Sequence, residues 1–292
     1  MKTMKFSLII VLACTLNTFV HAQIGIGTTT PNGVLDMNTD NLGLVFPTAS
    51  LTSTLVQSPV VNPAGGSLAV GTTVYNDNVT STGANDVHRG LYTWTGSYWS
   101  PQFIKKEYVK LEQSSVGQRI EIDPGSNPDP NNQTYITGLT GVTFTPTYSG
   151  DYRVEVKTNF GGGEVDSFAS GSDDISLCTT EGSFFFTMNG PGVDIDPTSS
   201  SYDYSEGWSY THSYSAHNDS DSPAIDNNNM IHHGTLLYYL YLRAGETYNI
   251  DVGINLYTGD DYLVGNGASG TDGRGYVGSF QPCSVSFEFI GD

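Results

Sequence analysis

The sequence predicts an all-β protein, a β-sandwich or jelly roll preceded by a small β-rich module. No window of twelve residues beyond the first 22 shows the 3.6-residue periodicity of an amphipathic helix. Short segments of alternating apolar and polar residues recur along the chain, and polar loops rather than helices separate them. Charged residues make up 14% of the chain and aromatic residues 12%, which favours a folded β protein over a disordered one.

The clearest strand patterns lie in residues 106–292. KKEYVKLE at 105–112 predicts the first strand, and the apolar runs at 183–190 and 235–245 predict core strands. Strict alternation at 144–160, 247–259 and 284–292 gives each strand one apolar face. The residues expected on these faces are Tyr152, Val154, Val156, Ile250, Val252, Ile254, Val285, Phe287 and Phe289, with Glu288 expected outside.

Residues 23–105 predict a small module of brief strands and turns, since Gly, Pro and Asn interrupt its short alternating pieces. A module with so few long apolar residues has a marginal core, and oligomerisation is one usual remedy. Its aromatic residues are interpreted as packing within the module, with ligand contacts as the alternative. They are Tyr92, Trp94, Tyr98 and Trp99.

Residues 1–22 have the pattern of a secretory signal, with two lysines, an apolar run and a small residue, Ala22, two positions after Val20. Cleavage is expected after Ala22, so the mature protein is expected outside the cytoplasm. VLAC at 11–14 resembles a loose lipoprotein box and leaves lipidation of Cys14 as an alternative, although the following residues are still apolar. No second apolar run reaches the roughly twenty residues that span a bilayer, so no transmembrane segment is expected.

The chain is strongly acidic, with 30 Asp and Glu against 11 Lys and Arg. Loss of Lys2 and Lys5 with the signal takes the net charge from -19 to -21. This charge argues against nucleic acid and anionic lipid as partners, because both are polyanions. It is compatible with a soluble surface protein and with cation binding.

Two cysteines, Cys178 and Cys283, remain after removal of the signal. An even pair in an oxidising compartment predicts a disulfide, and two buried free thiols are the alternative. Neither cysteine has the spacing of a zinc ligand.

Clusters of Asp and Asn occur at 123–130, 218–229 and 259–261. Such oxygen-rich loops are either solvated turns or calcium sites, and no cluster matches an EF-hand. If calcium binds, the candidate ligands are Asp219, Asp221, Asp226, Asp260 and Asp261. No other cofactor is expected.

The stretch at 201–217 alternates aromatic residues with hydroxyls and acids. Exposed aromatic rings beside hydrogen-bonding groups can stack on sugars or anchor an interface, and the alternative is packing between strands. The candidate ligand-binding residues are Tyr202, Tyr204, Trp208, Tyr210 and Tyr214. His232 and His233 are adjacent and therefore point to opposite faces of a strand, which argues against a shared metal ion.

The second region resembles the jelly roll of the complement and tumour-necrosis-factor superfamily. The resemblance rests on YSGDYRVEV at 148–156, LRAGETYNIDVGI at 242–254 and CSVSFEFIGD at 283–292. It implies a jelly roll over 106–292 and assembly as a compact trimer.

The first region resembles a module at the start of many secreted proteins of Bacteroidota, part of which recurs in phage tail-fibre-like proteins. The matching pieces are Ile24–Pro31, Leu42–Pro47, Val74–Asn76 and Leu91–Trp99. This resemblance implies attachment or assembly rather than catalysis.

These observations predict a signal at 1–22, an assembly module at 23–105 and a jelly roll at 106–292. The expected function is that of a secreted, non-enzymatic structural or adhesive protein of the cell surface, assembled as a homotrimer, with a surface protein or glycan as its other partner. The alternative is a carbohydrate-binding module. No nucleophile or phosphate-loop motif is present in the sequence, so no enzymatic activity is expected.

Overall fold

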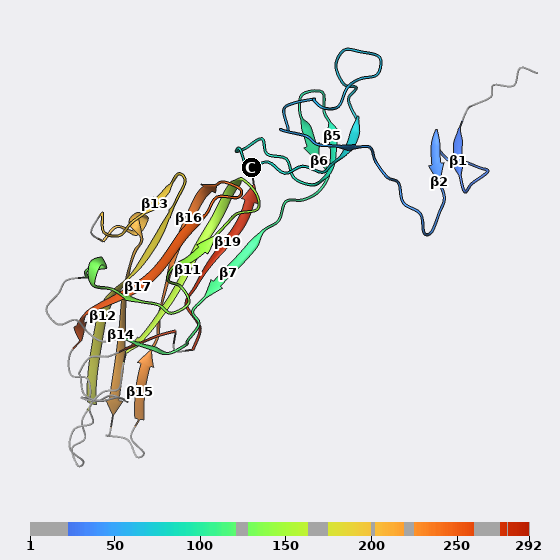
Figure 1. Cartoon of the computed structure of the whole chain (residues 1–292). Helices are drawn as coiled ribbons and strands as arrows, with labels where there is room; N and C mark the ends of the chain where they lie inside the picture. Colours follow the sequence, from blue (N-terminus) through green and yellow to red (C-terminus); the bar gives the residue numbers. More distant parts are fainter. Residues whose placement is uncertain are drawn as a thin grey trace, which may run out of the picture. The chain divides into compact units, whose positions relative to one another are not determined.

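The computed structural model describes residues 23–120, 128–162, 175–199, 202–218, 225–259, 275–278 and 280–291. These residues form mainly β-strands and loops (Figure 1), which confirms the predicted all-β class. The helical elements among them are two short 3-10 turns, η1 (Pro130–Asn132) and η2 (Tyr204–Glu206). The predicted signal at 1–22 lies outside the described residues. The chain divides into two compact units, Met1–Phe46 and Pro47–Asp292.

A β-sandwich forms the larger part of the second unit. The first sheet places four antiparallel strands side by side, in the order β7 (Tyr108–Glu112), β19 (Ser284–Gly291), β11 (Gly150–Gly162) and β16 (His232–Leu242). Beyond the end of β19, β18 (Gly275–Val277) takes its place beside β11, and β8 (Gln118–Ile120) pairs with β18. The long strands of this sheet are labelled in Figure 1.

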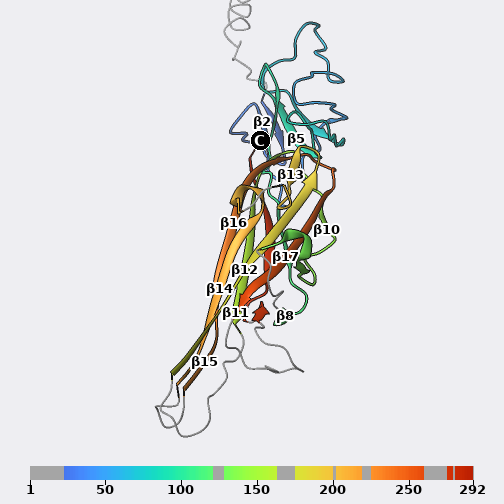
Figure 2. The ribbon, with the colours of Figure 1, turned by 90° about the vertical axis from the view of Figure 1, so that its left-hand side faces the viewer.

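The second sheet follows the order β10 (Val142–Phe144), β17 (Tyr248–Gly259), β12 (Ile175–Gly190), β14 (Trp208–Asn218) and β15 (Ile225–Met230). Two short strands join it, because β9 (Thr134–Tyr135) pairs with β17 and β13 (Val193–Ile195) pairs with β12. Figure 2 shows β12, β14 and β15 running together toward one end of the sandwich.

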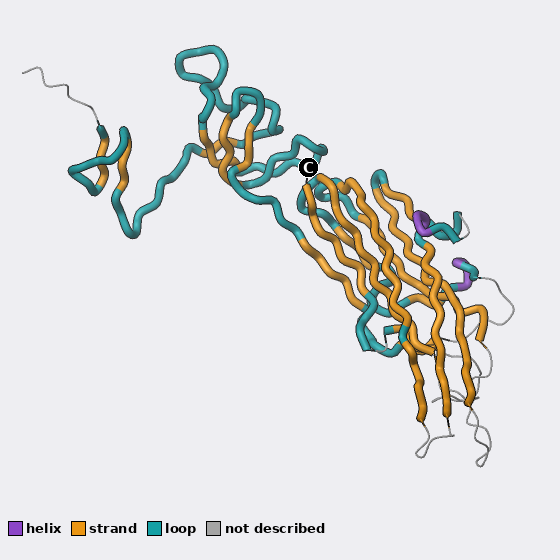
Figure 3. The backbone as a smooth tube through the Cα atoms, turned by 180° about the vertical axis from the view of Figure 1, so that it is seen from behind, coloured by secondary structure: helices purple, strands orange, loops and turns teal. Residues whose placement is uncertain are grey.

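The order of the strands identifies the sandwich as a jelly roll. Along the chain, β7, β11, β16 and β19 belong to the first sheet, and β10, β12, β14 and β17 belong to the second. Among these eight strands the chain crosses between the sheets at every connection except that from β12 to β14, instead of forming a simple meander. Figure 3 shows that the two helical turns lie in loops at the margin of the strands.

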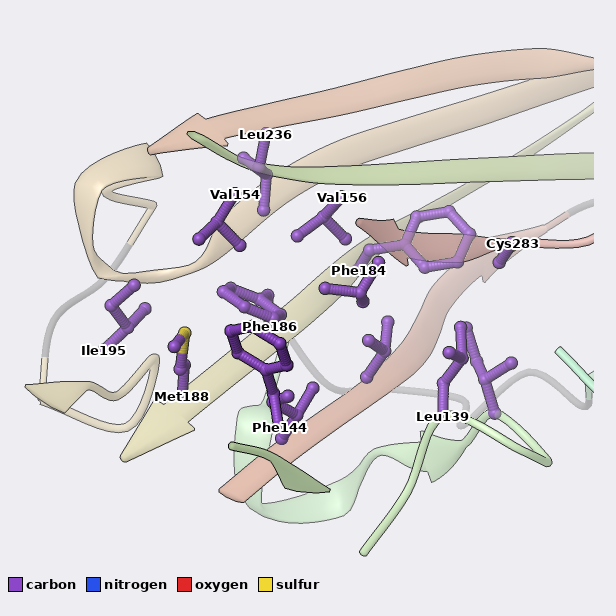
Figure 4. Close-up of a cluster of buried hydrophobic side chains, with 14 of the residues drawn as sticks. Leu139, Phe144, Val154, Val156, Phe184, Phe186, Met188, Ile195, Leu236 and Cys283 are labelled. Atoms are coloured by element: carbon purple, nitrogen blue, oxygen red, sulfur yellow. The ribbon is translucent and has the colours of Figure 1, made fainter. Parts of the chain in front are cut away.

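The core lies between the two sheets, and its side chains come from alternate positions of facing strands (Figure 4). The structure confirms the predicted inward residues, which are at most 1% exposed. Phe289 is the exception, since it is partly buried against the same cluster. Phe287 stacks on Phe144 with ring centroids 4.1 Å apart. Glu288 lies outside and pairs with Arg153 at 2.6 Å.

Strand β16 differs from the prediction of a core strand. Leu236 and Leu242 are buried, whereas Leu237, Tyr239 and Tyr241 on the opposite face are 48%, 65% and 40% exposed. The apolar run therefore faces the core on one side only.

Residues 47–103 form a small module with its own core. Its sheet has the order β3 (Thr48–Ala49), β4 (Thr73–Asn76), β5 (Gly90–Trp94) and β6 (Trp99–Pro101). Trp94 and Trp99 meet edge to face with centroids 5.4 Å apart, and the Trp99 indole donates to the carbonyl of Val56 at 2.9 Å. Tyr92, Trp94 and Trp99 are at most 2% exposed, which confirms packing within the module, whereas Tyr98 is 47% exposed.

This module joins the jelly roll through a buried carboxylate, Asp86. The carboxylate accepts hydrogen bonds from the Ser149 hydroxyl at 2.8 Å and from Thr80 and Thr82 of its own loop. Ser149 in turn accepts the N–H of Ala244 at 2.9 Å. The predicted boundary at 105/106 falls in the connection between β6 and β7, but residues 47–103 belong to the same compact unit as the jelly roll.

Candidate functional site

The described part of the first unit, residues 23–46, presents an apolar surface without a core. Strand β1 (Ile24–Ile26) pairs in parallel with β2 (Leu35–Met37), which aligns Ile24 with Leu35 and Ile26 with Met37. These four side chains therefore share one face of the pair. No residue from 23 to 46 is buried. Eight large apolar side chains there are 40% to 89% exposed, and Phe46 is partly buried; the eight are Ile24, Ile26, Val34, Leu35, Met37, Leu42, Leu44 and Val45.

We call these residues 23–46 the N-terminal apolar segment. A two-stranded ribbon alone in water is marginally stable at best. Because this segment buries none of its apolar side chains, it needs another surface to cover them.

A second apolar surface lies on the first sheet of the jelly roll. Leu237, Tyr239 and Tyr241 alternate along the outer face of β16 and form what we call the β16 stripe. Strand β16 pairs with β11 alone among the described strands, so the stripe runs along a sheet edge. Exposed aliphatic and aromatic side chains at an edge are typical of contacts with another chain.

The β16 stripe was not predicted, although the sequence carries a signal for it. TLLYYLYL at 235–242 is apolar at nearly every position. A strand apolar on both faces is expected to be covered on both. On the outer face of β16, Leu237, Tyr239 and Tyr241 stay 40% to 65% exposed, so the pattern indicates a further neighbour there.

The five aromatic residues predicted to bind a ligand do not form one site. Tyr202 and Tyr204 lie in the loop before β14 and are 58% and 62% exposed. Tyr210 and Tyr214 lie on the outer face of β14 and are 40% and 43% exposed. His212 lies between these two, with its ring centroid 5.7 Å from Tyr210 and 5.3 Å from Tyr214.

Trp208 corrects the prediction of an exposed stacking ring, because it is only 4% exposed. Its ring meets Phe185 edge to face at 4.8 Å, and Tyr202 covers it with centroids 5.2 Å apart. Its indole N–H donates to the carbonyl of Pro197 at 2.8 Å. The residue therefore packs a loop against the sheet and does not present a face to a ligand.

Two histidines meet where β14 approaches β16. The rings of His212 and His232 are 4.5 Å apart, and His232 Nδ1 lies 3.1 Å from the Thr211 hydroxyl. Burial lowers the pKa of His232 below its usual value, and the neighbouring His212 and His233 lower it further. His232 is therefore held neutral near pH 7.

The calcium candidates cannot be placed together. Asp219, Asp221, Asp260 and Asp261 lie outside the described residues, and the backbone of Asp226 lies in β15 while its side chain is not described. Within the described ranges, no three His, Cys, Asp or Glu residues gather as metal ligands. The calcium sites therefore stay a prediction.

Cys283 is a buried free thiol in the structure, which corrects the predicted disulfide with Cys178. Its sulfur accepts the backbone N–H of Asn159 at 3.4 Å. Burial raises the pKa of this thiol to about 11, because the thiolate would lie in an apolar surrounding. Cys178 lies in β12, and its side chain is not described.

Among the described elements, no helix has the length and apolar character needed to cross a membrane. A model of a family described as phage tail like trimerisation region matches residues 25–114. This match contains the N-terminal apolar segment from Gly25 onward and the whole module at 47–103. No curated protein matches the chain.

Solved structures with partial likeness include two animal proteins. The Eiger TNF from S. frugiperda is 11% identical, covers 64% of this chain and 94% of its own, and gives a TM-score of 0.27. The globular domain of the zebrafish complement 1qA protein is 14% identical, covers 64% and 98%, and gives a TM-score of 0.20. A structure of the infectious bursal disease virus Gx strain is 9% identical, covers 90% and 58%, and gives a TM-score of 0.24. TM-scores this low carry no argument about function or assembly.

Proposed function

We propose that this protein is a secreted, non-enzymatic structural or adhesive protein of the cell surface that assembles as a homotrimer. One observation carries the proposal. The N-terminal apolar segment exposes eight large apolar side chains, has no core, and lies almost wholly within residues that match a trimerisation region.

The physical argument starts from the face formed by Ile24, Ile26, Leu35 and Met37. Full burial of one such side chain contributes about 1.5–3 kcal/mol. Three copies of the segment that pack these faces together would remove them from water, which a single chain does not do. The β16 stripe supplies a second surface that the same assembly can cover.

The secreted location rests on the predicted signal at 1–22 and on the resemblance of the first region to secreted surface proteins. The structural role rests on the absence of a catalytic motif from the sequence and on the likeness to assembly modules. An acidic surface with a net charge near -21 keeps such a protein soluble.

The molar mass of the mature chain in solution tests the trimer. Light scattering after size separation, at several protein concentrations, is expected to give three times the mass of one chain. A single-chain mass at micromolar concentration would contradict the proposal. Protease accessibility on intact cells tests the surface location, and protection of the protein until lysis would contradict it.

Carbohydrate binding is a second candidate function, favoured by the exposed tyrosines Tyr210 and Tyr214 on the outer face of β14. Their rings flank His212, and the exposed 40% and 43% of these two side chains can contact a sugar. A glycan array with the native protein and the Tyr210→Ala variant tests it. Equal binding of both proteins would remove these tyrosines from the site.

A further inference from the structure

A hollow of about 620 Å³ lies on the outer face of the first sheet of the jelly roll. Residues from β7, β11, β16 and β19, together with the loop before β19, line it. Figure 1 shows these strands next to one another. The hollow lies toward the His233 end of β16, whereas the β16 stripe occupies Leu237 to Tyr241.

Two lysines border this hollow, although the chain as a whole is acidic. Lys110, Lys157 and His233 line it, and its described lining contains no Asp or Glu. The whole chain carries only 11 Lys and Arg against 30 Asp and Glu. Two lysines that border one hollow therefore mark a local preference for a negative group.

Both lysines are available to a ligand. Lys110 Nζ lies 2.5 Å from Glu112, Lys157 Nζ lies 3.1 Å from Glu155, and the lysine side chains are 43% and 58% exposed. Ion pairs this exposed contribute roughly 0–1 kcal/mol, so a bound anion can replace or share them. The strands that carry the lysines are separated by β19 alone, a spacing of about 10 Å, and Lys110 lies opposite Ser286 whereas Lys157 lies opposite Ser284, an offset of about 7 Å along the strands. Two lysine side chains can converge across that distance.

The floor of the hollow offers uncharged polar groups. Ser284 lies opposite Lys157 on β11, and Thr235 lies opposite Lys157 on the other side. Asn159 is 3% exposed, and its amide nitrogen donates to the carbonyl of Gln281. Its amide oxygen has no hydrogen-bond partner among the described residues. This oxygen is a buried acceptor, whereas Thr235 brings an exposed hydroxyl to the hollow.

We propose that this hollow binds the carboxylate and hydroxyl groups of an acidic sugar residue within an otherwise neutral glycan. The lysines suit the carboxylate and the exposed Thr235 suits a hydroxyl, while Ser284 and Asn159 are each 3% exposed. An acidic peptide fits less well, because Pro282 is the one apolar side chain that lines the hollow. A polyanion is disfavoured because the net negative charge of the chain repels it at long range. A single negative charge interacts mainly with the groups within about 8 Å, since salt screens the charges farther away.

Calorimetry with a tetrasaccharide of three neutral hexoses and one terminal glucuronic acid tests the proposal on the full mature protein. Its methyl ester keeps the hydroxyls and removes the charge. The double variant Lys110→Gln/Lys157→Gln removes both cations from the hollow. Lys106→Gln/Lys105→Gln makes the same charge change outside the hollow and serves as the matched control.

The native protein and the control variant should bind the acid about tenfold or more tightly than the ester, as expected for two charge-assisted hydrogen bonds. The double variant should bind acid and ester alike. Equal affinities for acid and ester in the native protein, or an equal loss in the control variant, would overturn the proposal. Competition by acetate or inorganic sulfate at the same molar concentration as the glycan would show a plain anion site and would also overturn it. A changed molar mass of the double variant would assign the hollow to a neighbouring copy instead, and the trimer itself is tested separately by the native mass.

Discussion

The trimer proposal makes a sharp prediction for the N-terminal apolar segment. In the variant Ile26→Ser/Leu35→Ser, two side chains on the shared face of β1 and β2 lose their apolar atoms. The two residues are 51% and 52% exposed in the single chain, so neither belongs to a buried core that the substitution would empty. We expect the variant to fold normally and to dissociate.

The magnitude follows from the exposed fractions. Full burial of an Ile or Leu side chain contributes about 1.5–3 kcal/mol, so covering the exposed half contributes about 1 kcal/mol for each. Burying a serine hydroxyl in its place adds a cost of about 1 kcal/mol or less when water or a neighbour can bond to it. The loss is then about 2–4 kcal/mol per chain, and each 1.4 kcal/mol weakens association tenfold. Three chains contribute to each trimer, so the shift in dissociation concentration is large.

Sedimentation equilibrium over a hundredfold range of concentration measures this shift. Val116→Ser is the matched control, because Val116 is 58% exposed and lies outside the residues that match the trimerisation region. The control should keep the native mass. An unchanged mass for Ile26→Ser/Leu35→Ser would refute the reasoning, and so would an equal loss in the control.

Three further predictions concern buried groups. Trp208→Ala should lower the free energy of unfolding by about 3–5 kcal/mol, because it empties a packed site, whereas Tyr210→Ala should change it by less than about 1 kcal/mol. Chemical denaturation measures both changes, and equal effects would contradict the burial argument. Asp86→Ala should cost about 2–3 kcal/mol at pH 7, since it leaves buried donors unpaired. Burial opposes ionisation of Asp86, but hydrogen bonds from Thr82, Ser149, Thr80 and Gly83 outweigh it and hold the carboxyl pKa below its usual 3.8. The native protein should therefore lose this stabilisation as the pH falls below 3.8, whereas the variant has none to lose. Cys283, with a thiol pKa of about 11, should not react with a disulfide reagent at pH 8 until the protein unfolds, and rapid native labelling that Cys283→Ser abolishes would show the thiol to be accessible.

The sequence predicted the inner faces of the jelly roll well where apolar and polar residues alternate. In 152–156, 250–254 and 285–287 the alternate positions prove to be buried between the sheets. The reason is that a strand in a two-layer sandwich has one dry and one wet face, so the period of two maps directly onto burial.

Alternation fails as a guide where both kinds of position are apolar or aromatic. The run at 183–190 places Phe184 and Phe186 in the core and Phe185 on the other face, where Trp208 covers it. Nothing in the local pattern at 201–217 distinguishes the buried Trp208 from the exposed Tyr210, because the contact with Phe185 joins two strands whose register only the fold defines. The hollow beside Lys110 and Lys157 was not predictable for the same reason. It is lined by β7 and β11, and these two strands are brought together only because β19 lies between them in the sheet.

The β16 stripe and the N-terminal apolar segment share a physical feature. In both, the side-chain pattern calls for a neighbour on a face that the described residues leave open. Natural sequences are locally consistent with their fold, so a run of strand residues that is apolar on its open face indicates a neighbour outside the single chain. The two surfaces occur in different units, and only one lies in the residues that match a trimerisation region. If Leu237→Ser in the stripe weakens the assembly as Ile26→Ser/Leu35→Ser does, both surfaces belong to one interface. If it leaves the molar mass in solution unchanged, the stripe is a docking face for a different partner, and the N-terminal apolar segment alone holds the copies together.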